Sequence, residues 1–300
     1  MISFRNHNRV IPLLFFIVLF LTACSSGKSP AGPKEMPTPY ANVTPMPTTG
    51  PTVTAEPAIV KSTEYNISDA DSSTIEDADD LIVTEPVPDL PAAKVVVLDP
   101  GHGGKFTGAI YFGQQEKDMT LKVANYIRDS LTANYENIEV YLTRETDIAL
   151  DPDIKIELEQ RAVIAKEHDA DFFVSLHFNA SEEHALHGAT VYASFRDNVG
   201  EASQGIAASI LNELVALGLK NNNVKTRVSK DYHAEDGSSL DYYAVIRHSA
   251  LRDIPGVIVE HCFMDNEIDK AYIETDEKLQ ALAEADARGI AKYLELKGKE

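Results

Sequence analysis

The sequence predicts a single α/β domain with a mostly parallel, twisted sheet of about six strands, flanked by helices. Three observations lead to this fold class. From about residue 93 onward, short β-branched runs alternate with segments of helical periodicity. About 205 residues remain for this region, which suits one domain. Its polar candidate residues follow directly after apolar runs, and we therefore expect a functional site at the carboxyl ends of the strands.

Six apolar runs are expected to form the strands. Each is short, rich in Val, Ile, Tyr or Phe, and separated from the next by polar or glycine-containing residues. These runs cover residues 94–99, 138–144, 171–177, 188–194, 242–247 and 256–261.

Four helices are expected between these strands, near residues 117–134, 156–168, 199–217 and 276–296. In the first helix, Met119, Val123, Ile127 and Leu131 recur at a spacing of four. This spacing places them on one face, which can pack against the sheet.

Composition excludes several classes of protein. The chain has 300 residues, of which 44% are hydrophobic, and so it needs no disulfide framework to form a core. Its two cysteines, Cys24 and Cys262, lie in different contexts. With 47 acidic against 27 basic residues and a formal charge of −20, the chain lacks the basic surface that nucleic-acid binding requires.

Residues 1–24 have the pattern of an export signal. Arg5 and Arg9 precede an apolar run that is too short to span a bilayer comfortably and that ends at Cys24. The ending "LTAC" resembles the lipobox of bacterial lipoproteins. This resemblance implies cleavage before Cys24, lipid modification of that residue, and anchoring to a membrane outside the cytoplasm. An ordinary signal peptide with a chance cysteine is the alternative.

Residues 25–92 are expected to be a disordered tether. This stretch holds eleven of the fifteen prolines, together with many Ser and Thr residues and 11 acidic against 3 basic residues. It has too few large apolar side chains to offset the entropy of ordering. The remaining residues, 93–300, form the expected catalytic domain.

Four polar residues stand at the predicted strand ends or at the start of a helix. His102 follows the first strand, Glu116 begins the first helix, His177 ends the third strand and Glu260 lies near the end of the last. Two imidazoles and one carboxylate, with a fourth position left for water, are the usual ligands of a catalytic zinc. Hydrogen-bonded surface histidines and a glutamate that complements a helix dipole are the alternatives. Ligand type alone does not distinguish zinc from other divalent ions.

Three glycines near His102 and the histidines outside the candidate metal site also bear on this interpretation. Gly101, Gly103 and Gly104 allow the backbone to turn sharply and approach a bound ion. The histidines expected to be solvated are His168, His184, His187, His233, His248 and His261.

Five motifs in order resemble those of the zinc-dependent N-acetylmuramoyl-L-alanine amidases, the third amidase family of peptidoglycan hydrolases. They are "VVVLDPGHGG", "EKDMTLKVANYI", "VYLTRETD", "LEQRAVIAKEHDADFFVSLHFNA" and "IPGVIVEHCFMDNEID", and the similarity covers nearly all of residues 94–295. The resemblance implies about six strands flanked by helices. It also implies that His102, Glu116 and His177 bind zinc and that Glu260 is the catalytic carboxylate.

Three further positions in these motifs have expected roles. Asn179 could orient His177 or contact substrate, or its use could be to satisfy the loop backbone. Arg144 is expected to pair with a carboxylate near the sheet edge. Arg161 is expected to fix the helix that precedes the "FFVSLH" strand.

The function implied by the resemblance is hydrolysis of the amide between N-acetylmuramic acid and L-alanine in peptidoglycan. Zinc and a nearby carboxylate suit amide hydrolysis in general, whereas the particular bond follows only from the resemblance. One alternative is a zinc peptidase that cuts elsewhere in the stem peptide. Another is a non-catalytic lipoprotein that binds the cell wall.

Two segments bear on regulation and specificity. Only thirteen residues separate His102 from Glu116, and so we expect an open site that needs no obligate activator. The segment 221–243 is long enough to act as a specificity loop or partial lid. Cys262, two residues after Glu260, is either a small buried thiol or a sulfur near the metal that makes the enzyme sensitive to oxidation.

Overall fold

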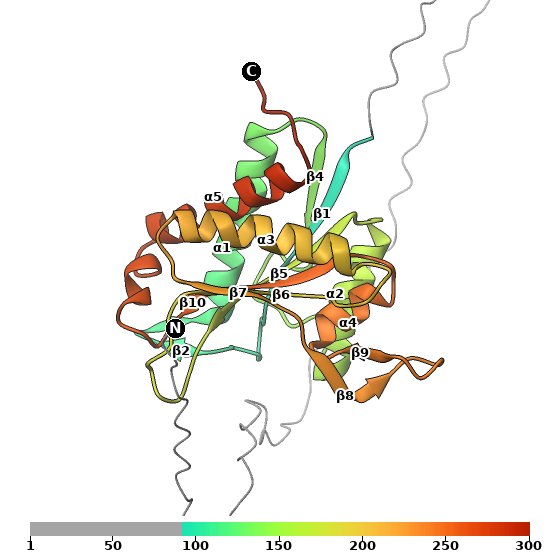
Figure 1. Ribbon diagram of the computed structural model, residues 1–300. Coiled ribbons are helices and arrows are strands. Elements are labelled where there is room, and N and C mark those ends of the chain that lie inside the picture. The colour runs from blue at the N-terminus through green and yellow to red at the C-terminus, as the bar shows by residue number, and fades with distance from the viewer. Residues whose placement is uncertain (1–91) are drawn as a thin grey trace, which may run out of the picture. The chain divides into compact units, whose positions relative to one another are not determined.

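In the computed structural model, which describes residues 92–300, a six-stranded sheet lies between two layers of helices (Figure 1). This arrangement confirms the predicted α/β fold. The export signal and almost all of the tether predicted above lie outside the described residues. Among the described helices, none is both long and apolar enough to span a membrane.

The sheet has the strand order β4-β1-β5-β10-β6-β7. The first four of these strands are parallel to their neighbours, β6 runs antiparallel to β10, and β7 runs parallel to β6. The strands are β1 (Lys94–Pro100), β4 (Ile138–Leu142), β5 (Phe172–Asn179), β6 (Ala189–Ala193), β7 (Asn221–Lys225) and β10 (Gly256–Phe263). Two small hairpins lie outside this sheet: β2 (Ile110–Tyr111) with β3 (Gln114–Gln115), and β8 (Val228–His233) with β9 (Ser239–Asp241).

Helices cover both faces of the sheet. One layer holds α1 (Glu116–Asn134), α3 (Gly200–Ala216) and α5 (Asp276–Tyr293), which follows the short 3₁₀ helix η1 (Asp269–Tyr272). The other layer holds α2 (Ile154–Glu167) and α4 (Ala244–Ala250). The predicted apolar stripe of α1 is confirmed, because Met119, Val123, Ile127 and Leu131 are all buried in the larger core.

Alternation along the central strands divides the core into two parts. On β5, Phe172 and Val174 pack against the layer of α1, α3 and α5, whereas Phe173 packs against α2 and α4. Successive side chains of a strand point to opposite faces, and so His177 shares the side of Phe173. By the same rule, Glu260 shares the side of Ile258, which lies in the smaller core.

One predicted element is wrong. The run at residues 242–247 was expected to be a strand, but it leads into helix α4. The buried residues of α4 are Val245, Ile246, Arg247, Ser249 and Ala250. The pairs Val245–Ile246 and Ser249–Ala250 are four residues apart, which is the spacing of a helical face rather than of a strand. The sixth strand is instead β7, an edge strand whose sequence "NNNVK" has one apolar residue, Val224, and therefore gives little strand signal.

The helical assignment of α4 can be tested at Ile246, whose side chain is buried in the smaller core. Truncation to alanine leaves a cavity, and we expect Ile246→Ala to lower the free energy of unfolding by about 2–4 kcal/mol in urea titrations. The exposed Leu251, which caps the same helix, provides the control. Equal losses for Ile246→Ala and Leu251→Ala would contradict this packing.

Candidate metal centre and active site

Three of the predicted site residues converge at the carboxyl ends of the strands. His102 lies in the loop after β1, Glu116 is the first residue of α1, and His177 is on β5. Each offers one donor atom, and these atoms lie within 4.8 Å of one another. Glu116 Oε1 is 3.0 Å from His102 Nε2 and 3.1 Å from His177 Nδ1. Among the described residues, this is the one cluster of His, Cys, Asp and Glu with such geometry.

The backbone orients the Glu116 carboxylate. Its Oε2 accepts a hydrogen bond from the backbone N–H of Ala109 at 2.9 Å, and its Oε1 accepts one from Phe178 at 3.1 Å. Burial acts to raise the pKa of Glu116, but the charges and hydrogen bonds of His102 and His177 outweigh it and hold the pKa well below its usual range. The carboxylate is therefore ionised at neutral pH.

The donors fit a divalent metal ion such as zinc. Burial lowers the pKa of His177, which favours the neutral imidazole that binds metals. One carboxylate and two imidazoles that converge from three separate elements are the donor set expected for a catalytic zinc.

Two glycines leave room for these donors. A Cβ on Gly101 would lie 2.3 Å from Cε1 of His177, and a Cβ on Gly108 would lie 2.4 Å from Oε2 of Glu116. Gly108 also has φ +66°, a conformation that favours glycine. The close approach of the backbone is thus part of how the cluster is built.

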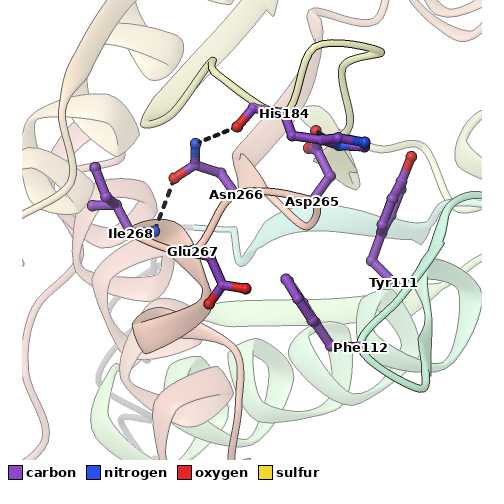
Figure 2. A pocket seen from close by; sticks show the side chains of 7 residues that line it. All are labelled: Tyr111, Phe112, His184, Asp265, Asn266, Glu267 and Ile268. Carbon is purple, nitrogen blue, oxygen red and sulfur yellow. Dashed lines mark hydrogen bonds and ion pairs between the residues drawn. The ribbon is translucent and has the colours of Figure 1, made fainter.

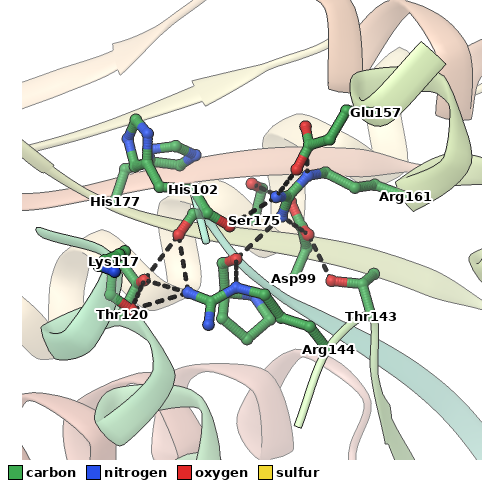
Figure 3. A network of polar contacts seen from close by, with 12 residues as sticks. Asp99, His102, Lys117, Thr120, Thr143, Arg144, Glu157, Arg161, Ser175 and His177 are labelled. Atoms are coloured by element: carbon green, nitrogen blue, oxygen red, sulfur yellow. Dashed lines mark hydrogen bonds and ion pairs between the residues drawn. The ribbon is translucent and has the colours of Figure 1, made fainter. Parts of the chain in front are cut away.

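A buried polar network supports the loop that carries His102 (Figure 3). Arg161 donates to Oδ1 of Asp99 at 2.5 Å, to the Pro100 carbonyl at 2.9 Å and to the His102 carbonyl at 2.7 Å. It also pairs with Glu157, one turn earlier in α2. Arg161 therefore does fix its helix, as expected, but it also holds the backbone of a candidate ligand.

Asp99 is the anion at the centre of this network. Its side chain accepts hydrogen bonds from Thr143 and Ser175, each at 2.6 Å. Burial acts to raise the pKa of Asp99, but Arg161 and the two hydroxyl groups together hold it below its usual value. Asp99 is therefore ionised although its side chain is fully buried.

Arg144 differs from its prediction. It was expected to pair with a carboxylate, but its guanidinium donates to the carbonyls of Pro100 and Gly101, both at 3.0 Å, and of Lys117 at 2.7 Å (Figure 3). Five rigidly placed donors suit a loop whose carbonyls point inward. Arg144 thereby joins the loop after β1 to the start of α1, on which Glu116 lies.

Glu260 lies beside this cluster. On β10 it is the register partner of His177 on β5. Its Oε2 is buried and has no hydrogen-bond partner. Burial and the nearby Glu116 charge raise the pKa of Glu260 to about 8. A carboxylate tuned toward neutrality can exchange protons at physiological pH.

Asn179 is the last residue of β5, and its carbonyl accepts a hydrogen bond from Met264 at 2.8 Å. This contact involves the backbone only. A contact of the Asn179 side chain with His177 or with substrate stays a prediction.

His261 was expected to be solvated, and that prediction is wrong. Its side chain is fully buried and bonds through Nε2 to Oδ2 of Asp286 at 2.6 Å. A carbonyl can only accept, and so Nδ1 donates to the His177 carbonyl at 2.9 Å. The signal available in the sequence was Asp286, a charge among buried apolar positions of α5, which requires a partner. The other five histidines lie at exposed or half-buried positions.

Cys262 packs in the larger core, with Val257 and Val259 of the same strand. Burial raises the pKa of its thiol well above the usual value. The thiol is therefore neutral and is protected from the thiolate chemistry that oxidation requires. This environment favours the packing role over the oxidation-sensitive one.

A hollow of about 440 Å³ opens beside the hairpin of β2 and β3 (Figure 2). Its lining residues are Tyr111, Phe112, His184, Asp265, Asn266, Glu267 and Ile268. Asp265 accepts hydrogen bonds from His184 at 2.8 Å and from Ser181 at 3.1 Å, and the Tyr111 ring meets the His184 ring edge-on. The lining thus comes from the β2–β3 hairpin, the loop after β5 and the loop after β10.

Comparisons with known proteins agree with this geometry. A family model described as N-acetylmuramoyl-L-alanine amidase matches residues 96–292. The chain is 35% identical over 209 residues to the endolysin of Bacillus phage SPP1, covering 69% of this chain and 68% of that protein. It is 30% identical over 203 residues to a sporulation-specific N-acetylmuramoyl-L-alanine amidase of Bacillus subtilis (strain 168), covering 67% and 69%.

Solved structures share the fold. The catalytic domain of CwlV, an N-acetylmuramoyl-L-alanine amidase from Bacillus (Paenibacillus) polymyxa var. colistinus, matches with a TM-score of 0.55 and 28% sequence identity. The match covers 68% of this chain and 99% of that domain. The family match over residues 96–292 includes His102, Glu116 and His177.

The buried pair of His261 and Asp286 can be tested by truncation. Removal of one partner leaves the other buried without its bond, and we expect Asp286→Ala to lower the free energy of unfolding by about 3–5 kcal/mol. Arg288, on the same helix, forms an exposed pair with Glu213 and provides the control. Arg288→Ala should cost less than about 1 kcal/mol. Similar losses for both variants in chemical denaturation would contradict the role of the buried pair.

Proposed function

Because the chain belongs to the N-acetylmuramoyl-L-alanine amidase family and is therefore a peptidoglycan amidase, we propose that its activity depends on zinc held by His102, Glu116 and His177. The observation that supports this most strongly is the convergence of the three donor atoms within 4.8 Å. The ionised state of Glu116 and the neutral state favoured for His177 suit metal binding. Zinc at these donors would supply Lewis-acid chemistry, lowering the pKa of a water and polarising the amide carbonyl.

Glu260 is the proposed general base and general acid. Its free, buried Oε2 and its register pairing with His177 support a position within reach of the attacking water. In this role, Glu260 accepts the proton of the water as the water attacks the amide carbon. It then returns that proton to the amide nitrogen, which leaves as the amine of L-alanine. No other proton carrier is required, because one proton is taken and one is given back.

The bond proposed for cleavage joins the lactyl group of N-acetylmuramic acid to the first L-alanine of the stem peptide. This choice follows from the family, since the same donors could serve a peptidase acting elsewhere in the stem peptide. The products distinguish the two reactions. An amidase releases intact stem peptides with a new L-alanine amino terminus.

The proposed location is the cell envelope. Peptidoglycan amidases act outside the cytoplasm, in the cell wall. The export signal and the lipobox-like ending at Cys24 support a lipid anchor, with residues 25–92 as the tether that separates the catalytic domain from the membrane. We also propose that the site needs no activator, because residues 110–115 between His102 and α1 form only a small hairpin.

Dependence on metal is tested by mass spectrometry of peptidoglycan digested with the purified protein. We expect intact stem peptides to be released, release to stop when a chelator removes the metal, and zinc to restore it. Release that continues in chelator would contradict the metal proposal. Release only after a second protein is added would contradict the open site.

Glu260→Gln tests the proton carrier, because glutamine keeps the size of the side chain and cannot take up the proton. We expect kcat to fall by at least about a hundredfold while bound zinc, measured by elemental analysis, stays at the wild-type level. Glu284→Gln, at an exposed position of α5, should retain wild-type activity. A Glu260→Gln enzyme with wild-type kcat would remove Glu260 from the mechanism.

A further inference from the structure

A cation held against aromatic rings lies where the chain enters the β8–β9 hairpin. The guanidinium of Arg227 is 3.5 Å from the centre of the Tyr242 ring and 5.9 Å from the centre of the Tyr243 ring. Tyr243, in turn, packs against Tyr192 of β6, with ring centres 4.5 Å apart. The two consecutive tyrosines thus hold the Arg227 head group in place, and Tyr192 supports one of them.

This cluster lies on the same side of the sheet as Glu260. In the pairing of β6 with β10, Tyr192 is opposite Ile258 and Thr190 is opposite Glu260. Paired residues of neighbouring strands point to the same face. The Tyr192 side chain therefore lies on the same face as Glu260, opposite a position two residues before Glu260 on β10. The pKa of Tyr243 is raised, chiefly by burial and by its bond with Tyr192, and the charge of Glu260 also contributes. Through its contact with Tyr192, Tyr243 therefore packs on the face of the sheet that carries Glu260.

Arg227 has no anionic partner of its own. Within residues 92–300, no aspartate or glutamate forms an ion pair with it, although acidic residues outnumber basic ones in this chain. By contrast, the half-buried Arg252 pairs with Glu159, and the exposed Arg288 pairs with Glu213. A guanidinium stacked on a ring face keeps its in-plane N–H groups free to donate. One donor of Arg227 bonds to the Tyr243 hydroxyl, and because the side chain is exposed and oriented by the rings, other N–H groups remain able to donate.

We propose that Arg227 binds the substrate carboxylate nearest to the scissile amide, on the second residue of the stem peptide, and is thus a specificity-determining residue. The inference rests on the proposed reaction at Glu260. The planar fork of arginine matches a carboxylate with two parallel hydrogen bonds.

The test compares two soluble muramyl tripeptides that differ only at the second residue, whose α-carboxyl group is either free or converted to its primary amide. The purified wild-type protein should cleave the free acid with a kcat/KM about tenfold higher than the amide, since bonds to charged groups are the stronger ones. Arg227→Gln should lower kcat/KM for the free acid by about tenfold and leave the amide unchanged. Arg227→Lys keeps the charge but loses the planar guanidinium group. Its kcat/KM for the free acid should lie between those of the wild type and Arg227→Gln.

Lys230→Gln provides the matched control, because Lys230 is an exposed cation of the same hairpin. It should leave both substrates at wild-type rates. Three results would overturn the inference: no preference in the wild type, a preference that survives Arg227→Gln, or an equal loss on both substrates. Cleavage of both tripeptides by the wild type would uphold the amidase function in each of these cases, whereas cleavage of neither would count against that function itself.

Discussion

The buried ion pair of Asp99 with Arg161 is the interaction on which the geometry of the site depends. Neither charge reaches solvent, and each is compensated: Asp99 by two hydroxyl groups, and Arg161 by Glu157 on its own helix. Such a pair is costly to bury and is stable only when its remaining hydrogen bonds are made. Here those bonds go to the loop after β1, and so the energy of the pair is coupled to the position of His102. Arg144 supports the same loop from the side of α1.

The two glutamates of the site show how environment separates their chemistry. Glu116 faces two imidazoles and two backbone N–H groups, which stabilise its charge. Glu260, only one strand away from those groups, has a buried oxygen without a donor and feels the charge of Glu116. One carboxylate is thereby suited to bind a cation and the other to carry a proton. The separation arises from the surroundings, chiefly the two imidazoles beside Glu116, because the two side chains are chemically identical.

Much of the fold and of the candidate site could be predicted from the sequence, because both depend largely on local patterns. The period of four in α1 and the β-branched runs before His102 and Glu260 identified these elements, and their order placed the polar residues at one edge of the sheet. The predictions that were wrong concern features that depend on tertiary contacts. The segment at Tyr243 has strand-like residues but folds as the start of α4, because its buried side chains follow a helical face. His261 required knowledge of Asp286, which is distant in sequence.

If His102, Glu116 and His177 together hold zinc, all three should be detectable as ligands of the bound ion. X-ray absorption spectroscopy at the zinc edge of the zinc-loaded protein tests this most directly, because it reports the ligand atoms themselves. We expect one zinc per chain with two imidazole nitrogens at about 2.0–2.1 Å and oxygen ligands at about 2.0–2.2 Å. We also expect His177→Ala to remove one imidazole from the spectrum. A sulfur ligand at about 2.3 Å, or a spectrum that is unchanged in His177→Ala, would contradict this zinc site.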